Sequence, residues 1–265
     1  MVDRTRRTVL ATVGGTVALG LAGCSQNEGA GGTETNGTTT DEMTEGETTE
    51  EETTTTETMS DEMANVRVAH MSPDAPNVDV YVDGDPVLTD VPFRTTSDYL
   101  ELAPGTYTVM ITAAGDESTV VFEDDLTVEA ADYTVVAAGE LADDGEAFEV
   151  LVLEDDTSDP GGDSARVRLV HVAPDAPAVD VTSGGTTVFD GAAYGETATQ
   201  TVPANDYTLE IRPDSDGDDA EVVADYDVSL NGRTAYTVFA AGYLSPDDEP
   251  TDESFDLLVE QDASY

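Results

Sequence analysis

Apolar and polar residues alternate along many short stretches of the chain from residue 64 onward. One stretch places Val66, Val68 and His70 on one side and Arg67, Ala69 and Met71 on the other. A period of two residues is that of a β-strand. The first part of this region predicts strands over 66–71, 78–83, 86–90, 98–103, 105–113, 119–128, 132–140 and 148–154. Short strands bounded by turn residues at this spacing predict an antiparallel β-sandwich of immunoglobulin-like or transthyretin-like kind.

The same pattern occurs twice. Residues 70–80 read HMSPDAPNVDV and residues 171–181 read HVAPDAPAVDV, an offset of 101. Tyr-Thr-Val and Ala-Gly landmarks recur later at nearly the same offset, and a period this long indicates a duplicated domain. We therefore predict an all-β fold with two tandem sandwiches, at 64–155 and 165–265, joined by a Pro- and Gly-containing linker at 156–164.

The first 23 residues have the pattern of an export signal. A basic start containing Arg6-Arg7, similar to a twin-arginine motif, precedes an apolar run over 9–22. That run is too short to span a bilayer, which takes about 20 residues. It ends in Leu-Ala-Gly-Cys24, which resembles a lipobox, so we expect cleavage before Cys24 and lipidation of its thiol; an ordinary signal peptide with a chance cysteine is the alternative.

Residues 24–63 are rich in Thr, Glu and Gly and contain no aromatic residue. A segment of this composition cannot bury apolar surface, which predicts a disordered stalk. Asn36 begins an Asn-Gly-Thr sequon and is a candidate for glycosylation.

Charge narrows the set of partners. The 265 residues include 58 acids and only nine basic residues, all arginine, for a net charge of −49. Such a chain repels nucleic acids, and it is typical of proteins that work in concentrated salt, where a Debye length of about 3 Å screens the repulsion. Cys24 is the single cysteine, which excludes an intrachain disulfide and a multi-cysteine metal site.

The doubled HxxPDAPxVDV motif, the Pro-Gly-Thr-Tyr-Thr-Val at 104–109 and the later Tyr-Thr-Val and Ala-Gly resemble the domain-of-unknown-function family 4397 over about 64–155 and 165–262. The second copy departs from the first at 203–206, where Pro-Ala-Asn-Asp replaces the Pro-Gly turn. The resemblance implies a fold and an exported or surface location, here in a lipoprotein of halophilic-archaeal type. It implies no activity and no catalytic residue.

His70 and His171 are the only histidines and occupy the same place in each repeat. One interpretation makes them metal ligands or general bases. The other makes each ring a hydrogen-bond partner of the following Pro-Asp-Ala-Pro corner, since buried polar groups need partners. We favour the structural interpretation, because one histidine per domain is too few for a zinc site. The motif residues are His70, Pro73, Asp74, Pro76, Asp79, His171, Pro174, Asp175, Pro177 and Asp180.

Other candidates are weaker. Asp214, Asp216 and Asp218 resemble part of a calcium loop, but glycine is missing where an EF-hand requires it, so a solvated loop is the favoured interpretation. Arg67 with Asp79, and Arg168 with Asp180, are candidates for cross-strand ion pairs. No catalytic residue and no cofactor is predicted.

Two main functions remain open. The first is a non-enzymatic lipoprotein on the outer face of the membrane, serving adhesion, envelope contact or assembly with an envelope protein or glycan. The second is a lipoprotein that captures a sugar, peptide or cation, for which exposed tyrosines are the candidate contacts: Tyr81, Tyr99, Tyr194 and Tyr243. A hydrolase centred on the histidines is a third and less favoured alternative. The sequence leaves the oligomeric state open.

Overall fold

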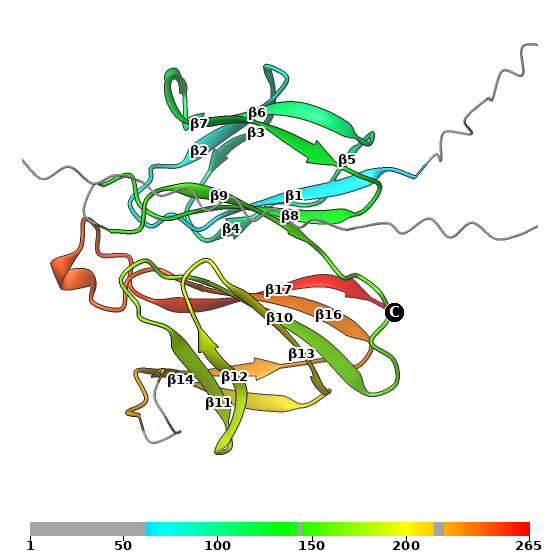
Figure 1. The fold of residues 1–265 in the computed structure, drawn as a ribbon, viewed down its shortest axis with the longest axis vertical. Helices are drawn as coiled ribbons and strands as arrows, with labels where there is room; N and C mark the ends of the chain where they lie inside the picture. Colours follow the sequence, from blue (N-terminus) through cyan, green and yellow to red (C-terminus); the bar gives the residue numbers. More distant parts are fainter. Residues whose placement is uncertain (1–61, 143–144, 215–219) are drawn as a thin grey trace, which may run out of the picture. The chain divides into compact units, whose positions relative to one another are not determined.

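The computed structural model describes residues 62–142, 145–214 and 220–265. Within these ranges the chain is all β except for the single-turn 3-10 helix η1 (Pro246–Asp248). The strands form two sandwiches of two sheets each (Figure 1). The predicted leader, Cys24, the Asn36 sequon and the stalk up to residue 61 lie outside the described residues. The described part of the chain contains no helix with the length and apolar character needed to cross a bilayer.

The first sandwich consists of an inner sheet, which faces the second sandwich, and an outer sheet. The inner sheet has the order β4-β1-β8-β9, with β5 beside β4 along β1, and the outer sheet has the order β3-β2-β6-β7. The bounds are β1 (Ala64–His70), β2 (Val78–Val82), β3 (Asp85–Val91), β4 (Thr95–Thr96), β5 (Leu100–Leu102), β6 (Gly105–Ala113), β7 (Asp116–Val128), β8 (Asp132–Ala138) and β9 (Glu149–Glu154).

The second sandwich repeats this topology. Its inner sheet has the order β13-β10-β16-β17 and its outer sheet the order β12-β11-β14-β15. The bounds are β10 (Ser164–Val172), β11 (Val179–Ser183), β12 (Thr186–Ala192), β13 (Thr197–Pro203), β14 (Asp206–Pro213), β15 (Ala224–Ser229), β16 (Thr234–Ala241) and β17 (Asp256–Ser264).

The predicted fold class is confirmed, and each predicted strand of the first copy overlaps an observed one. One feature of the pairing was not expected. β1 runs parallel to β8, and β10 runs parallel to β16, whereas the other strand pairs are antiparallel. A parallel pair needs a long connection. Here the outer sheet itself lies between the paired strands in sequence and supplies that connection.

Each sandwich has its own apolar core between its two sheets. In the first, Val68, Val80 and Ile111 pack together, and in the second, Leu169, Val181 and Ile211 do so at the equivalent places. These residues lie on the faces that strand alternation predicts. Burying such side chains away from water contributes about 25 cal/mol per Å² of apolar surface.

A further apolar cluster joins the two inner sheets. It contains Ala69, Met71, Val136 and Ala138 from the first sandwich and Val170, Val172, Phe239 and Ala241 from the second. The inner sheets are therefore covered on both faces, and the four sheets form layers in the order outer, inner, inner, outer (Figure 1). This explains why β16 is buried at all eight of its positions and reads as a continuous apolar run apart from its threonines.

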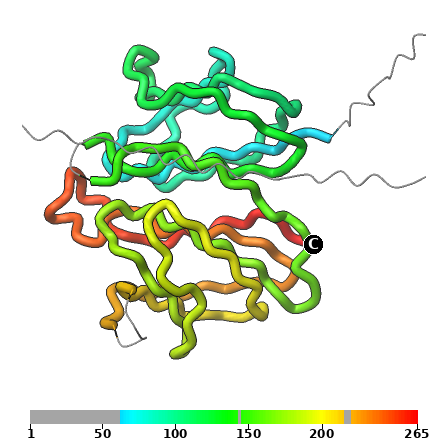
Figure 2. Tube along the Cα trace, in the orientation of Figure 1, coloured from blue at the N-terminus to red at the C-terminus, as the bar shows by residue number. Residues whose placement is uncertain are grey.

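The segment between β9 and β10 is held against the second sandwich (Figure 2). Arg166 donates from Nη1 to the backbone oxygens of Asp156 and Ser158, at 2.9 and 2.6 Å. Arg233 donates from Nη2 to Asp159 at 2.6 Å, and the Tyr265 hydroxyl donates to the Thr157 carbonyl. This linker is thus a packed part of the fold.

Candidate functional site

The two histidines are buried at equivalent corners. Nε2 of His70 lies 3.1 Å from the Pro76 carbonyl oxygen, and Nε2 of His171 lies 3.1 Å from that of Pro177. A carbonyl only accepts, so Nε2 carries the proton in both rings. Both rings are fully buried, and burial lowers the pKa of each histidine below its usual value of 6.5. The arrangement joins the end of the first strand of each repeat to the corner that follows.

The aspartates of the Pro-Asp-Ala-Pro corners bind loops. The Asp74 carboxylate accepts the backbone N–H groups of Leu141 and Ala142 at 2.9 and 2.8 Å. Asp175 accepts those of Leu244 and Ser245, both at 2.7 Å. Each carboxylate therefore fixes the start of the loop after the inner parallel strand of its own sandwich. Pro73 contributes through its carbonyl, which accepts from the Thr251 hydroxyl at 3.0 Å, whereas Pro174 is half-buried at the corresponding place.

The second pair of motif aspartates also binds backbone. Asp79 accepts the N–H groups of Asp90 and Gly115 at 2.7 and 2.8 Å, and Asp180 accepts that of Gly191 at 2.7 Å. The predicted ion pairs of these aspartates with Arg67 and Arg168 are wrong. The aspartates lie on β2 and β11 of the outer sheets. The arginines lie on β1 and β10 of the inner sheets, on the face directed away from the sandwich core, because they alternate with the core residues of those strands.

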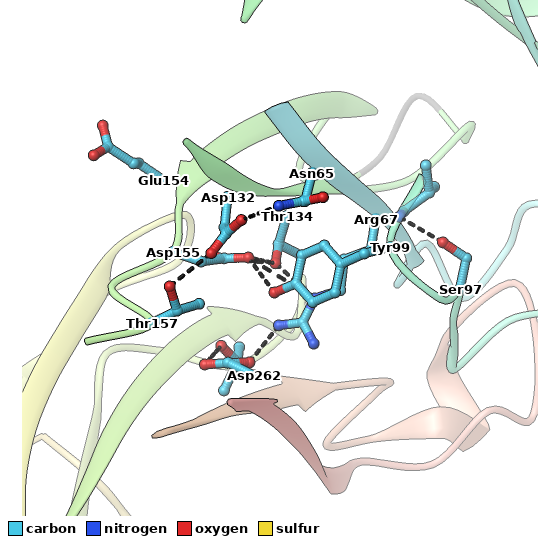
Figure 3. Close-up of polar contacts among 12 residues, drawn as sticks. Asn65, Arg67, Ser97, Tyr99, Asp132, Thr134, Glu154, Asp155, Thr157 and Asp262 are labelled. Carbon is cyan, nitrogen blue, oxygen red and sulfur yellow. Dashed lines mark hydrogen bonds and ion pairs between the residues drawn. The ribbon is translucent and has the colours of Figure 1, made fainter. Parts of the chain in front are cut away.

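Instead, the arginines form a buried polar network between the two sandwiches (Figure 3). Arg67 donates from Nε to the Thr134 hydroxyl at 2.9 Å, and from Nη2 to the Asp262 carboxylate of the second sandwich. The Thr134 hydroxyl in turn donates to Asp155 at 2.8 Å. The Arg67 and Asp262 side chains are 3% and 6% exposed, so this is an ion pair removed from water.

Arg168 makes the reciprocal set of contacts. It donates from Nε to the Thr237 hydroxyl at 3.1 Å and from Nη2 to the Asp155 carboxylate of the first sandwich at 2.5 Å. The Thr237 hydroxyl donates to Asp262 at 2.9 Å. Each arginine thus reaches the aspartate of the other sandwich, and each threonine connects its arginine to its own aspartate. Two positive and two negative groups balance inside the interface.

The two halves of the network differ at one place. In the first sandwich the Tyr99 ring covers the Arg67 guanidinium, with 4.8 Å from Cζ to the ring centroid, and its hydroxyl donates to Asp155 at 2.6 Å (Figure 3). Burial and the neighbouring Asp155 raise the pKa of Tyr99. In the second sandwich the residue opposite Arg168 on the neighbouring strand is Thr199, which has no ring. A small pocket of about 50 Å³ lies beside these two residues.

Within the described part of the chain, Asp262 has no tyrosine partner that corresponds to the Tyr99 hydroxyl on Asp155. Burial raises the pKa of the Asp262 carboxyl, and Arg67, Thr237 and Arg168 oppose that shift. These three partners favour the charged form of the carboxylate, and the cost of desolvation works against it.

The tyrosines proposed as ligand contacts do not gather in a cleft. Tyr81 and Tyr243 are buried, at 6% and 0% exposure, so the expectation that they are exposed is wrong. Tyr99 lies in the network, and the Tyr194 ring packs edge-on against His171 at 6.3 Å. These side chains take part in packing and form no shared aromatic surface.

The carboxylate loop is only partly described. Asp214 is exposed and donates its backbone N–H to the Ala178 carbonyl at 2.8 Å, whereas Asp216 and Asp218 lie outside the described residues. Across residues 62–142, 145–214 and 220–265, no three His, Cys, Asp or Glu side chains come together in a way that holds a metal ion.

Sequence reasoning missed the network residues Thr134, Asp155, Thr237 and Asp262. One signal was present: Arg67 shares a face of the first strand with Ala69 and Met71, so this second face is apolar apart from the arginine. An arginine that recurs on a two-sided apolar strand indicates a buried partner. The strand pattern does not say which distant carboxylate that partner is.

Comparison with solved structures gives matches of low similarity. One is the carbohydrate-binding module CBMbc (family CBM26) from Eubacterium rectale Amy13K, crystallised with maltoheptaose, at 10% identity and a TM-score of 0.23 over 75% of this chain and 96% of that one. Another is the Bacillus anthracis TIE protein, at 11% identity and a TM-score of 0.23 over 69% of this chain and 34% of that one. A third is the fimbrial anchor protein Mfa2 from Porphyromonas gingivalis, at 13% identity and a TM-score of 0.19 over 77% and 100%. Scores this low carry no functional argument.

No curated protein matches the sequence. Two stretches, residues 64–182 and 174–264, match the family described as "Domain of unknown function (DUF4397)". Together they span both sandwiches, and the first stretch extends beyond the linker into the second sandwich. The chain belongs to the DUF4397 family and carries its domain in tandem.

Proposed function

We propose that this chain is anchored by lipid to the outer face of the cell membrane, where it displays two packed β-sandwiches, and that its role there is non-enzymatic: adhesion, envelope contact or assembly. One observation carries the non-enzymatic part. The side chains best suited to acid–base chemistry are the two histidines and the four motif aspartates. Each of them forms hydrogen bonds with backbone groups inside the fold.

Catalysis by a histidine requires a ring nitrogen that reaches a substrate. His70 and His171 have no exposed surface, and the protonated Nε2 of each donates to a proline carbonyl of its own corner. Nδ1 of His171 accepts the Ala173 N–H at 3.3 Å. Neither ring has access to solvent, so both support a structural role.

The anchor rests on the leader and on Cys24. Intact-mass spectrometry of the membrane fraction tests it by comparing wild type with Cys24→Ser, and Ser25→Ala serves as the matched control next to the modified residue. We expect a mature N-terminus at Cys24 carrying lipid mass in wild type and Ser25→Ala, and release of the unlipidated Cys24→Ser chain. An unlipidated wild-type chain contradicts the anchor.

The non-enzymatic surface role has its own test. Cells that carry wild type or Cys24→Ser are compared for adhesion and for retention of envelope proteins that co-purify with the chain. We expect both properties to depend on anchoring and to survive replacement of the two histidines by residues that preserve the fold. An activity that follows the histidines while the fold is intact contradicts the proposal.

A second candidate function has one observation in its favour. An open groove of about 390 Å³ lies along the second sandwich, lined by Ser183, Thr186, Thr187, Val188, Gln200, Val202, Pro203 and Tyr207. None of these residues is charged, in a chain of net charge −49. An uncharged groove suits a neutral sugar or an uncharged peptide rather than a cation.

Titration of the chain with neutral oligosaccharides and uncharged peptides tests ligand capture. Gln200→Ala removes the amide from the groove, and Gln261→Ala, at an exposed position of β17, is the matched control. Binding that Gln200→Ala alone weakens supports capture in this groove. Equal weakening by both variants, or no binding at all, contradicts it.

A further inference from the structure

The contact between the sandwiches has the reciprocity of a symmetric dimer. Arg67 of the first sandwich binds Asp262 of the second, and Arg168 of the second binds Asp155 of the first. In a two-fold interface the same patch is used on both sides, so that residue i meets j and residue j meets i. The tandem repeat therefore pairs like faces of two similar domains.

Where such an interface approaches its two-fold axis, a position meets its own equivalent. Glu140 follows Ala-Ala-Gly139 in the first repeat, and Tyr243 follows Ala-Ala-Gly242 in the second. These two equivalent residues touch: the Tyr243 hydroxyl donates to the Glu140 carboxylate at 2.7 Å. Glu140 is 4% exposed and Tyr243 has no exposed surface.

We propose that the unlike pair Glu140–Tyr243 makes this face selective, so that the first sandwich accepts the second sandwich and rejects a second copy of itself. If two first sandwiches paired through the same face, two buried carboxylates would meet with no donor between them. Like charges at such a site are strongly unfavourable, and each carboxylate would lose its hydrogen bond.

A second self-equivalent position supports the same reasoning. Val136 and Phe239 occupy corresponding places in β8 and β16, and both belong to the cluster between the inner sheets. This repeat position thus contributes one small and one large side chain to the cluster. Two valines would leave a void and two phenylalanines would overfill the space, and both changes are destabilising.

Selectivity has a direct consequence for an exported chain with this interface. The two faces of one molecule cover each other, and the linker is held to the second sandwich by Arg166 and Arg233. The partner that the first face fits is thus the second repeat of the same chain. Neighbouring copies, even when concentrated on a surface, do not join through like faces.

Variants at position 243 of the full chain test the proposal. Tyr243→Glu places a carboxylate on both sides and reproduces, inside one chain, the contact that two first sandwiches would make. Tyr243→Gln removes the ring to the same extent without adding charge. Both variants are made with Glu140 and with Glu140→Gln, and unfolding by denaturant is measured for all four.

The penalty of interest is the factor by which Tyr243→Glu raises the unfolding equilibrium constant above that of Tyr243→Gln. We expect this penalty to be about a hundredfold when residue 140 is Glu. With Glu140→Gln the penalty should fall by at least about tenfold, because the facing carboxylate is gone. Other nearby acids, Asp74 and Glu249, act equally in both backgrounds and cancel from the comparison.

Equal penalties in the two backgrounds overturn the proposal. Loss of folding in Tyr243→Glu is also informative: recovery of folding by Glu140→Gln supports the proposal, and failure to recover while Tyr243→Gln with Glu140→Gln folds overturns it. Val223→Glu, at a position 42% exposed, controls for the general cost of adding a carboxylate to an acidic chain.

Discussion

Replacing Asp155 by asparagine removes one charge from the centre of the network while keeping the side-chain volume. The Asp155 side chain has no exposed surface and accepts from Arg168 at 2.5 Å, from Thr134 at 2.8 Å and from Tyr99 at 2.6 Å. Asparagine offers one acceptor oxygen, and its amide group turns a donor toward groups that are donors themselves.

The size of the effect follows from burial. Arg67 and Arg168 are 3% and 11% exposed at their side chains, and both lie within 4.0 Å of Asp155. Removing one partner of a buried ion pair leaves an uncompensated buried charge, at a cost of about 3–5 kcal/mol. We therefore expect Asp155→Asn to lower the free energy of unfolding by about 3 kcal/mol or more.

The assay is urea unfolding followed by far-ultraviolet circular dichroism and tyrosine emission, because the chain has ten tyrosines and no tryptophan. Asp159→Asn is the matched control. Asp159 pairs with Arg233, whose side chain is 50% exposed, and a pair of that kind contributes about 0–1 kcal/mol. Both variants are measured at 0.1 M and at 1 M salt, where the Debye length falls from about 10 Å to about 3 Å.

The buried effect should persist in 1 M salt, whereas the control effect should vanish. If Asp155→Asn costs no more than Asp159→Asn, or loses its effect in high salt, the network is not a buried ion pair in solution and the reasoning from burial is refuted.

Three further changes have expected outcomes. Thr199→Tyr supplies the ring that the second half of the network lacks and should stabilise the protein by about 1 kcal/mol through a cation–π contact and a hydrogen bond, as measured by the urea midpoint. Burial lowers the folded-state pKa of His70 and His171 below 6.5, so below about pH 6.5 the unfolded chain binds more protons than the folded chain. The free energy of unfolding should therefore be fully present above that pH and fall on acidification by up to about 2.7 kcal/mol per pH unit. Replacing both histidines by glutamine should remove this slope, and an unchanged slope in the double variant would contradict the reasoning. Gly139→Ala places a Cβ 2.4 Å from a backbone carbonyl at a φ of +79° and should destabilise strongly, whereas Gly115→Ala, at a φ of +75° with open space around it, should cost only about 1 kcal/mol in thermal or urea unfolding.

The strands follow from local patterns in the sequence. Alternation at Val66, Val68 and His70, the turn residues between strands and the offset of 101 between the two His-x-x-Pro-Asp-Ala-Pro motifs are local or repeated signals, and they gave an all-β fold with two sandwiches. Local signals suffice here because the period of two residues fixes which side chains share a face.

The way in which the strands and sandwiches combine depends on contacts that form only in the folded chain. The parallel pairing of β1 with β8, and the partnership of Arg67 with Asp262 at a separation of 195 residues, depend on contacts between distant segments. The sequence shows an arginine on an apolar face, and many acids are available to pair with it. Which one does so is set by the packing of the two inner sheets, because an ion pair acts only over the few ångströms that the folded interface brings together.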